Sequence, residues 1–103
     1  MTGNLEYFKV FYYTAKSGSV TGAAALLSIS QPAVSQSLRQ LERSLGVSLF
    51  CRASRGMKLT AEGELLFSYV SKGYEQIEQG VEKVKQMRNL ELGEVREAVR
   101  AAL

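Results

Sequence analysis

Residues 29–42 read Ile-Ser-Gln-Pro-Ala-Val-Ser-Gln-Ser-Leu-Arg-Gln-Leu-Glu, and this stretch decides the fold. It holds Pro32, the one proline of the sequence, directly ahead of a helical pattern of apolar residues. Proline is tolerated in the first turn of a helix, because the backbone N–H groups there have no intrahelical partner. The sequence therefore predicts a helix over residues 30–45, with Ser30 as its N-cap and Gly46 closing it.

The predicted helix has two contrasting faces. One carries an apolar stripe at steps of three and four residues, which should face a core: Val34, Leu38, Leu41 and Leu45. The opposite face carries mostly uncharged polar residues near the helix N-terminus: Gln31, Pro32, Ser35, Gln36 and Arg39. Glutamine can bond adenine bidentately in the major groove, serine can donate or accept, and an apolar ring can contact a thymine methyl. This face is a candidate for reading base edges, although a Ser/Gln face on its own is more often simply solvated.

The segments before this helix predict two more helices. Residues 5–16 have apolar residues at helical spacing and end at Ser-Gly. Residues 22–27 form a short alanine-rich piece, for which Ser19 or Thr21 could be the N-cap. Small alanines let another backbone approach closely across the tight connection at residues 28–29. The predicted helices over residues 22–27 and 30–45 therefore form a helix-turn-helix.

A basic hairpin is predicted after the helix-turn-helix. Two short extended runs, residues 47–50 and 59–60, enclose a Gly-containing segment over residues 51–58. This segment carries three cations: Arg52, Arg55 and Lys58. No acidic residue occurs between Glu42 and Glu62. As a wing beside the helix, these cations could contact phosphate or enter the minor groove; the alternative is an ordinary solvated turn.

One long helix is predicted from Ala61 to about Asn89. At ~1.5 Å per residue it would be on the order of 45 Å long, more than a core of this size can cover. Its apolar seam steps by three and four residues and is the predicted dimer interface: Leu66, Phe67, Val70, Tyr74, Ile77, Val81 and Val84. A seam of this kind meets another helix in a coiled coil, so we expect a homodimer. Gly73 and Gly80 either weaken the helix or permit a close helix crossing.

The composition excludes the usual catalytic and metal sites. There is no histidine and no aspartate, and Cys51 is the single cysteine, so neither a neutral-pH general base nor a thiolate zinc site can be built. Residues 1–60 carry seven Lys/Arg against two Glu, whereas residues 61–103 carry six against eight. We therefore expect a protein without enzymatic activity, metal or cofactor, whose basic half binds a polyanion.

Nothing in the sequence predicts a membrane protein. No apolar run approaches the ~18 residues of a membrane span. The N-terminus lacks the basic and apolar regions of a signal peptide, and a lone cysteine fits a reducing compartment. The expected location is the cytoplasm.

Five short motifs occur in order along the sequence: Ala-Ala-x-x-Leu, Ser-Gln-Pro-Ala-x-Ser, Leu-Glu-x-x-Leu-Gly, Leu-Phe-x-Arg and Leu-Thr-x-x-Gly. Over about residues 4–90 the chain resembles the N-terminal domain of LysR-type transcriptional regulators. The resemblance implies a mainly α winged helix-turn-helix over residues 1–59, with three helices and a short two-stranded wing. It also implies a linker helix over residues 60–90 that dimerises antiparallel with its mate, and sequence-specific binding of double-stranded DNA.

The resemblance also implies roles for individual residues. Base contacts in the major groove would fall to Gln31, Pro32, Ser35 and Gln36. Contacts with the DNA backbone or minor groove would fall to Thr21, Ser30, Arg39, Arg52 and Arg55. The family usually has Arg or Lys at the positions of Gln36 and Gly22, which puts two contacts with phosphate or guanine in doubt. Cys51 stands where the family usually has an acid.

The family carries an effector-binding domain that would begin near Leu92-Gly93. From Val95 onward the sequence is instead rich in Ala and Arg, unlike the β-strand expected there. We therefore expect an isolated or truncated DNA-binding domain with a tail, in which a small-molecule effector acts only on a full-length form. The competing interpretation is a helical protein-interaction adaptor, whose long helix binds another chain and whose helix-turn-helix is only scaffold.

Overall fold

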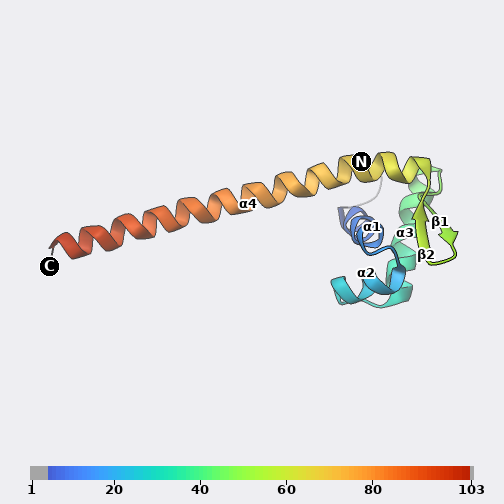
Figure 1. The fold of residues 1–103 in the computed structure, drawn as a ribbon, viewed down its shortest axis with the longest axis horizontal. Coiled ribbons are helices and arrows are strands. Elements are labelled where there is room, and N and C mark those ends of the chain that lie inside the picture. The colour runs from blue at the N-terminus through green and yellow to red at the C-terminus, as the bar shows by residue number, and fades with distance from the viewer. Residues whose placement is uncertain (1–4, 103) are drawn as a thin grey trace. The chain divides into compact units, whose positions relative to one another are not determined.

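The computed structural model describes the backbone of residues 5–102 and the side chains of residues 5–90, 93 and 100–102. The elements follow in chain order: α1 (Leu5–Ser17), α2 (Val20–Leu27), α3 (Gln31–Leu45), β1 (Phe50–Ala53), β2 (Gly56–Leu59) and α4 (Ala61–Ala102) (Figure 1). The predicted fold class is confirmed: a mainly helical chain with a two-stranded antiparallel wing and a long C-terminal helix.

The chain divides into two compact units, Met1–Ser71 and Lys72–Leu103. The sequence placed the end of the winged domain at residue 59. The first unit continues into α4 because Leu66, Phe67 and Val70 are half-buried against its core. The first turns of α4 are therefore part of the first unit.

The core of the first unit is formed by one face of each of α1, α2 and α3, with Leu49 added from the segment before β1. Its buried members are Val10, Phe11, Ala23, Ala24, Val34, Leu38, Leu41 and Leu49. The Phe11 ring lies 5.5 Å from that of Phe50 and 6.4 Å from that of Phe67, measured between ring centroids. Leu45, expected in the same stripe, is 36% exposed, because it is the last residue of α3 and the chain reverses at Gly46.

The capping residues of α2 and α3 are hydroxyl side chains. Ser19 Oγ accepts a hydrogen bond from Gly22 N at 2.9 Å, which selects Ser19 over Thr21 as the N-cap of α2. That helix therefore begins at Val20, two residues before the predicted start. Ser30 Oγ accepts from Ala33 N at 3.2 Å and caps α3 as predicted.

The hairpin is shifted along the sequence relative to the prediction. β1 pairs antiparallel with β2, with Cys51 opposite Lys58 and Arg52 opposite Met57. Of the predicted first run, residues 47–50, only Phe50 lies in a strand. Leu49 is instead buried in the core, and its N–H donates to the Glu42 carboxylate rather than to a neighbouring strand.

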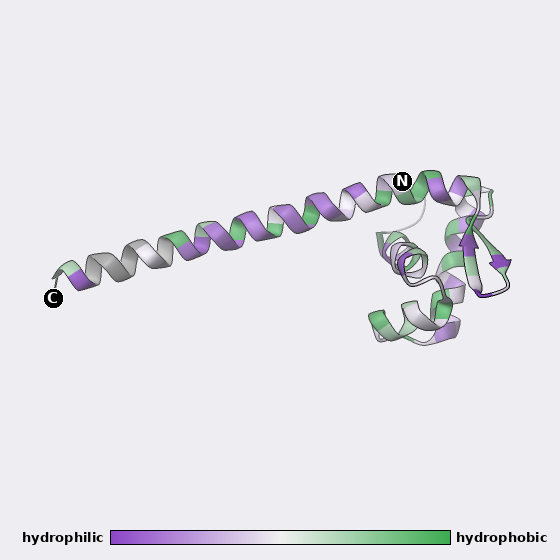
Figure 2. Cartoon of the chain, viewed as in Figure 1, coloured by the Kyte–Doolittle hydropathy of each residue, from purple (hydrophilic) through white to green (hydrophobic). Residues whose placement is uncertain are grey.

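The helix α4 extends beyond the predicted end near Asn89 and reaches Ala102. Gly93 does not interrupt it, since a single glycine costs only about 1 kcal/mol in a helix. In the second unit, apolar and polar residues alternate along α4 (Figure 2). Its large apolar side chains are 47–69% exposed: Ile77, Val81, Val84, Met87 and Leu90. Within the described residues, no helix is long and apolar enough to cross a membrane.

Candidate nucleic-acid interface

The predicted polar face of α3 is at the surface of the first unit. Gln31, Pro32, Gln36 and Arg39 are exposed, and Ser35 is half-buried. Pro32, Gln36 and Arg39 lie opposite the buried stripe of α3, because side chains on one helix face recur every three to four residues. Gln31 is exposed because it is the first residue of α3. The structure therefore brings the predicted base-reading residues together on one accessible surface.

Arg43 belongs to the same surface and was missed as a site residue in the sequence. It is exposed, and it follows Pro32, Gln36 and Arg39 at steps of four, three and four residues. The signal was available in this spacing, which mirrors the apolar stripe on the opposite side of α3. Arg43 adds a cation at the C-terminal end of the polar face.

The three wing cations are exposed but do not share one face of the hairpin. Residues opposite each other in an antiparallel pair point to the same side, so Arg52 shares a side with Met57 and Lys58 with Cys51. Met57 is half-buried against the core, which places Arg52 on the side of the wing that faces the helices. Arg55 lies between the two strands, in the turn.

Arg52 lines a hollow of about 300 Å³ between the wing and the start of α2. Ser19 and Val20 contribute the α2 side of this hollow. Thr21, the next residue, is exposed in the first turn of α2. A helix N-terminus attracts phosphate through its N–H groups and dipole, so this corner suits a DNA backbone contact.

Gly22, a position where the resemblance implies a basic residue, packs closely against the end of α1. A Cβ atom at this position would lie 2.8 Å from Ser17 Cβ and 2.9 Å from Ser17 Oγ. A side chain there would require Ser17 to move. The close packing against Ser17 therefore accounts for a glycine, and not a basic residue, at this position.

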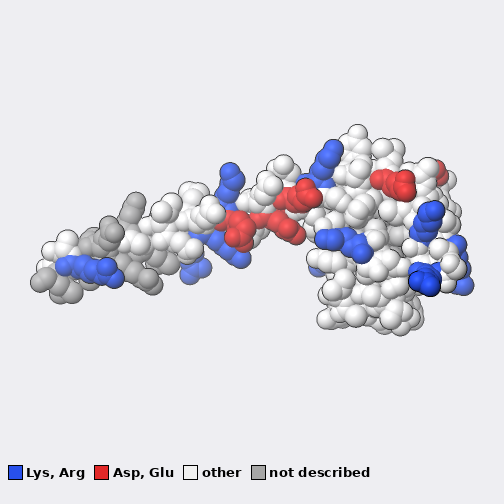
Figure 3. Space-filling model, viewed as in Figure 1, with Lys and Arg blue, Asp and Glu red and all other residues white. Residues whose placement is uncertain are grey.

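The charges of this surface are uncompensated. Among the described side chains, no carboxylate pairs with Arg39, Arg43, Arg52, Arg55 or Lys58. Figure 3 shows Lys and Arg side chains gathered over the hairpin edge of the first unit. A polyanion can therefore take these cations as partners without displacing a carboxylate of the chain.

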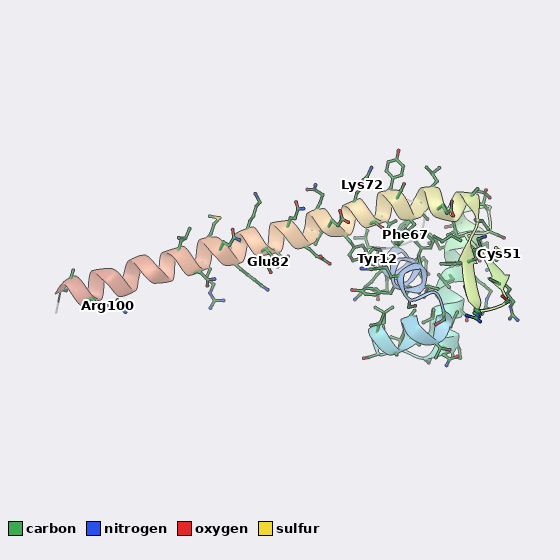
Figure 4. All side chains as sticks on the ribbon, viewed as in Figure 1. Tyr12, Cys51, Phe67, Lys72, Glu82 and Arg100 are labelled. Carbon is green, nitrogen blue, oxygen red and sulfur yellow. The ribbon has the colours of Figure 1, made fainter. Side chains whose placement is uncertain are left out.

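Cys51 lies on the wing and is exposed (Figure 4). Its Sγ donates to the Lys58 carbonyl oxygen at 3.5 Å, across the strand pair. In the described part of the chain, no three potential metal ligands come together.

The predicted dimer residues fall into two groups. Leu66, Phe67 and Val70 pack partly on their own core, and the Phe67 ring stacks on Tyr12 at 5.8 Å (Figure 4). Ile77, Val81 and Val84, in the second unit, are exposed, and Tyr74 is half-buried. The sequence seam is therefore covered by the chain's own domain at one end and open at the other.

The sequence also missed an apolar hollow of about 350 Å³ in the first unit. Leu65 and Tyr69 of α4 line it together with Leu45 and Val47, and all four are exposed. These α4 residues lie beside the predicted seam, so a search for seam residues alone does not find them.

Residues 5–64 match the family described as bacterial regulatory helix-turn-helix protein, lysR family. The chain is 41% identical over 76 residues to the HTH-type transcriptional regulator GltR of Bacillus subtilis (strain 168), covering 74% of this chain and 26% of GltR. It is 40% identical over 84 residues to the HTH-type transcriptional activator AmpR of Providencia stuartii, covering 76% of this chain and 29% of AmpR. The chain thus spans roughly a quarter to a third of the length of such relatives.

Solved structures are similar over most of the chain. The BenM_DBD/catB site 1 DNA complex gives a TM-score of 0.73 at 33% identity, covering 82% of this chain and 96% of that one. The CbnR_DBD-DNA complex gives 0.69 at 29% identity, covering 81% and 95%. Full-length BenM gives 0.70 at 34% identity and covers 81% of this chain but 27% of its own.

Proposed function

The chain belongs to the lysR family of bacterial regulatory helix-turn-helix proteins, and we propose that this DNA-binding domain of a transcriptional regulator reads duplex DNA with the exposed face of α3. The observation that carries the proposal is the two-sided construction of α3. Val34, Leu38 and Leu41 fix one side in the core, and the other side presents uncharged hydrogen-bonding residues to solvent. A helix of this kind can enter the major groove N-terminus first.

In this proposal, base readout falls to the N-terminal half of α3. Gln31 and Gln36 hydrogen-bond base edges, Ser35 donates or accepts, and the Pro32 ring contacts a thymine methyl. These groups are uncharged, so the contacts carry sequence information rather than general affinity. The similar chains solved with DNA support this use of the domain.

Positioning falls to the cations and the helix starts around α3. Arg39, Arg43 and Arg52 contact phosphate, assisted by Thr21 and Ser30 at the starts of α2 and α3. Arg55 and Lys58, at the turn and on the outer side of the wing, contact phosphate or enter the minor groove. The uncompensated charge of these side chains supports this part of the proposal.

We further propose that two copies pair through α4 and so read paired half-sites. The exposed Ile77, Val81 and Val84 support this pairing, with Tyr74 in the same seam. Leu66, Phe67 and Val70 then contribute the part of their surface that the core leaves open. Half-sites read by such a dimer lie about one helical turn of DNA apart, or multiples of that.

The proposed division of the chain follows from this assignment. Residues 1–59 form the winged helix-turn-helix, residues 60–90 the dimerising linker helix, and residues 91–103 the tail where an effector domain would begin. A small-molecule effector would act only on a full-length form that carries such a domain. The relatives are transcriptional regulators and not enzymes, and the proposed location is the cytoplasm, where bacterial DNA is found.

The test is selection of bound duplexes from a random pool by the wild-type chain. We expect enrichment of two related half-sites at fixed spacing, with affinity that falls steeply as salt rises. Absence of enrichment, together with weak binding to heparin and to random duplex at low salt, would favour the protein-interaction adaptor instead. Enrichment of a single half-site would support base readout by α3 but contradict the proposed dimer.

A further inference from the structure

Glu42 is the one acidic residue of α3, and it lies in the same helix turn as the cations Arg39 and Arg43. It is half-buried and points to the segment that leads into the wing. Its Oε2 accepts hydrogen bonds from Leu49 N at 2.6 Å and from Phe50 N at 3.4 Å. A negative charge at this place repels a polyanion. The carboxylate is therefore better explained by its hydrogen bonds to the segment before the wing than by a contact with the partner.

The backbone of Glu42 holds the same segment from a second side. Its carbonyl oxygen accepts from Gly46 N at 2.8 Å and from Val47 N at 3.3 Å, where α3 ends. One residue therefore binds four successive or nearly successive N–H groups between the end of α3 and the start of β1. The path of the chain from α3 into the wing is set by this residue.

The start of α4 holds the opposite edge of the segment. Thr60 N donates to the Leu49 carbonyl oxygen at 3.0 Å, and Thr60 Oγ1 donates to that of Ser48 at 2.7 Å. Gly63 lies so close to the Leu49 carbonyl that a Cβ atom would collide with it. Leu49 itself is buried in the core. The inner end of the wing is thus clamped between α3 and the first turn of α4.

From this geometry we infer that Glu42 is a positioning residue for DNA binding, which fixes the wing cations at a set place beside α3. The inference rests on the proposed function. Phe50 is the first residue of β1 and pairs with Leu59, so the Glu42 hydrogen bonds determine where the strand begins. Arg52 follows two residues later on the same side of the strand. The outer part of the wing is held by Met57 N, which donates to the Gly18 carbonyl oxygen at 3.0 Å.

The test compares Glu42→Met with Glu42→Gln. Both side chains are neutral and close in length to Glu, but only Gln keeps an oxygen that can accept both N–H groups. Each variant is made with and without Arg52→Ala in the full chain. Dissociation constants are measured over a salt series, on a duplex enriched from a random pool by the wild-type chain.

In the wild-type background, Arg52→Ala should weaken binding by about tenfold or more, as expected for a charge-assisted contact. It should also flatten the salt slope by roughly 0.9, the value for one phosphate. In the Glu42→Met background, Arg52→Ala should weaken binding by less than about twofold, which is the usual error of additive effects. In Glu42→Gln it should matter as in wild type. An equal effect of Arg52→Ala in the Met and wild-type backgrounds would overturn the inference.

Backbone amide spectra give a readout without DNA. Glu42→Met should shift the amide signals of Leu49, Phe50 and β1, and Glu42→Gln should leave them near wild type. Unmoved signals in Glu42→Met overturn the inference, even if the wild-type chain enriches no duplex and the proposed function itself fails. Should Glu42→Met not fold, Glu42→Gln decides, because a folded Gln variant in which Arg52→Ala no longer weakens binding contradicts the inference.

Discussion

Gln31 and Val34 are three residues apart in α3, yet the first is exposed and the second fully buried. Residues three apart lie on one side of a helix, so the apolar stripe alone does not explain this difference. The sequence predicts it through the N-cap Ser30, which makes Gln31 the first residue of the helix. It does not predict Glu42, whose partners Leu49 and Phe50 lie seven and eight residues further along. A hydrogen bond between a side chain and a distant backbone amide leaves no periodic mark in the sequence.

Replacing Gln31 with Ala tests base readout at a single side chain. We expect the affinity for an enriched duplex to fall by about 1–3 kcal/mol, the discrimination of one bidentate base contact. Affinity for random duplex should change little, because that binding depends on phosphate contacts. Gln79→Ala, an exposed glutamine in the second unit, is the matched control in the same titration. Equal losses on both duplexes would remove the readout role.

Replacing Gly63 with Ala tests the close contact at the start of α4. The added methyl group meets the Leu49 carbonyl, so stability should fall by about 1–3 kcal/mol, as in other overpacked sites. The control is Gly73→Ala in the same helix, which has nothing within 4 Å of the new Cβ. That change should raise stability by up to ~1 kcal/mol in urea unfolding. A loss of stability at Gly73 would instead indicate a close helix crossing.

Among the elements, the helices were predicted more accurately than the wing. Helix starts and ends are marked locally, by Ser30 and Gly46 for α3. The strands were expected around residues 47–50 and 59–60, whereas the pairing runs from Phe50 to Ala53 and from Gly56 to Leu59. Local β propensity could not place the strands, because tertiary contacts fix their ends. Leu49 is buried in the core, and Met57 N donates to the Gly18 carbonyl oxygen in the turn between α1 and α2.

The wing makes a prediction of its own through the double change Arg52→Ala with Arg55→Ala. Binding to specific and random duplexes should weaken together, and the salt slope should flatten by roughly 0.9 for each phosphate that is no longer neutralised. Lys85→Ala is the control, since that lysine is in the second unit and pairs with Glu82 at 3.6 Å. A slope equal to that of the wild type, measured by titration over a salt series, counts against wing contacts.

For the whole molecule, the sequence predicted one continuous dimer seam along the long helix. The first unit uses Leu66, Phe67 and Val70 for its own core, whereas Ile77, Val81 and Val84 are exposed. An apolar stripe on a helix does not say whether its partner is the same chain or another one. The division could therefore not be predicted from spacing alone.

Introducing Glu at Ile77 tests pairing of the whole chain. A carboxylate buried in a helix–helix seam without a partner is strongly unfavourable, so the variant should sediment as a monomer. Gln79→Glu adds the same charge two residues away, on the opposite side of the helix, and should leave the dimer intact. A dimer that persists in Ile77→Glu would refute the seam.

The link from Gly46 to Phe50 has a consequence for how such domains diverge. Each of the three residues between Gly46 and Phe50 makes a hydrogen bond through its backbone: Val47 and Leu49 through their N–H groups, and Ser48 and Leu49 through their carbonyls. An insertion of one residue would shift the pairing register of β1 by one, and the Arg52 side chain would then point to the other face of the hairpin. Descendants of this chain can therefore change the side chains of Val47 and Ser48, which are exposed, but they must keep an apolar residue at Leu49 and the number of residues in the link.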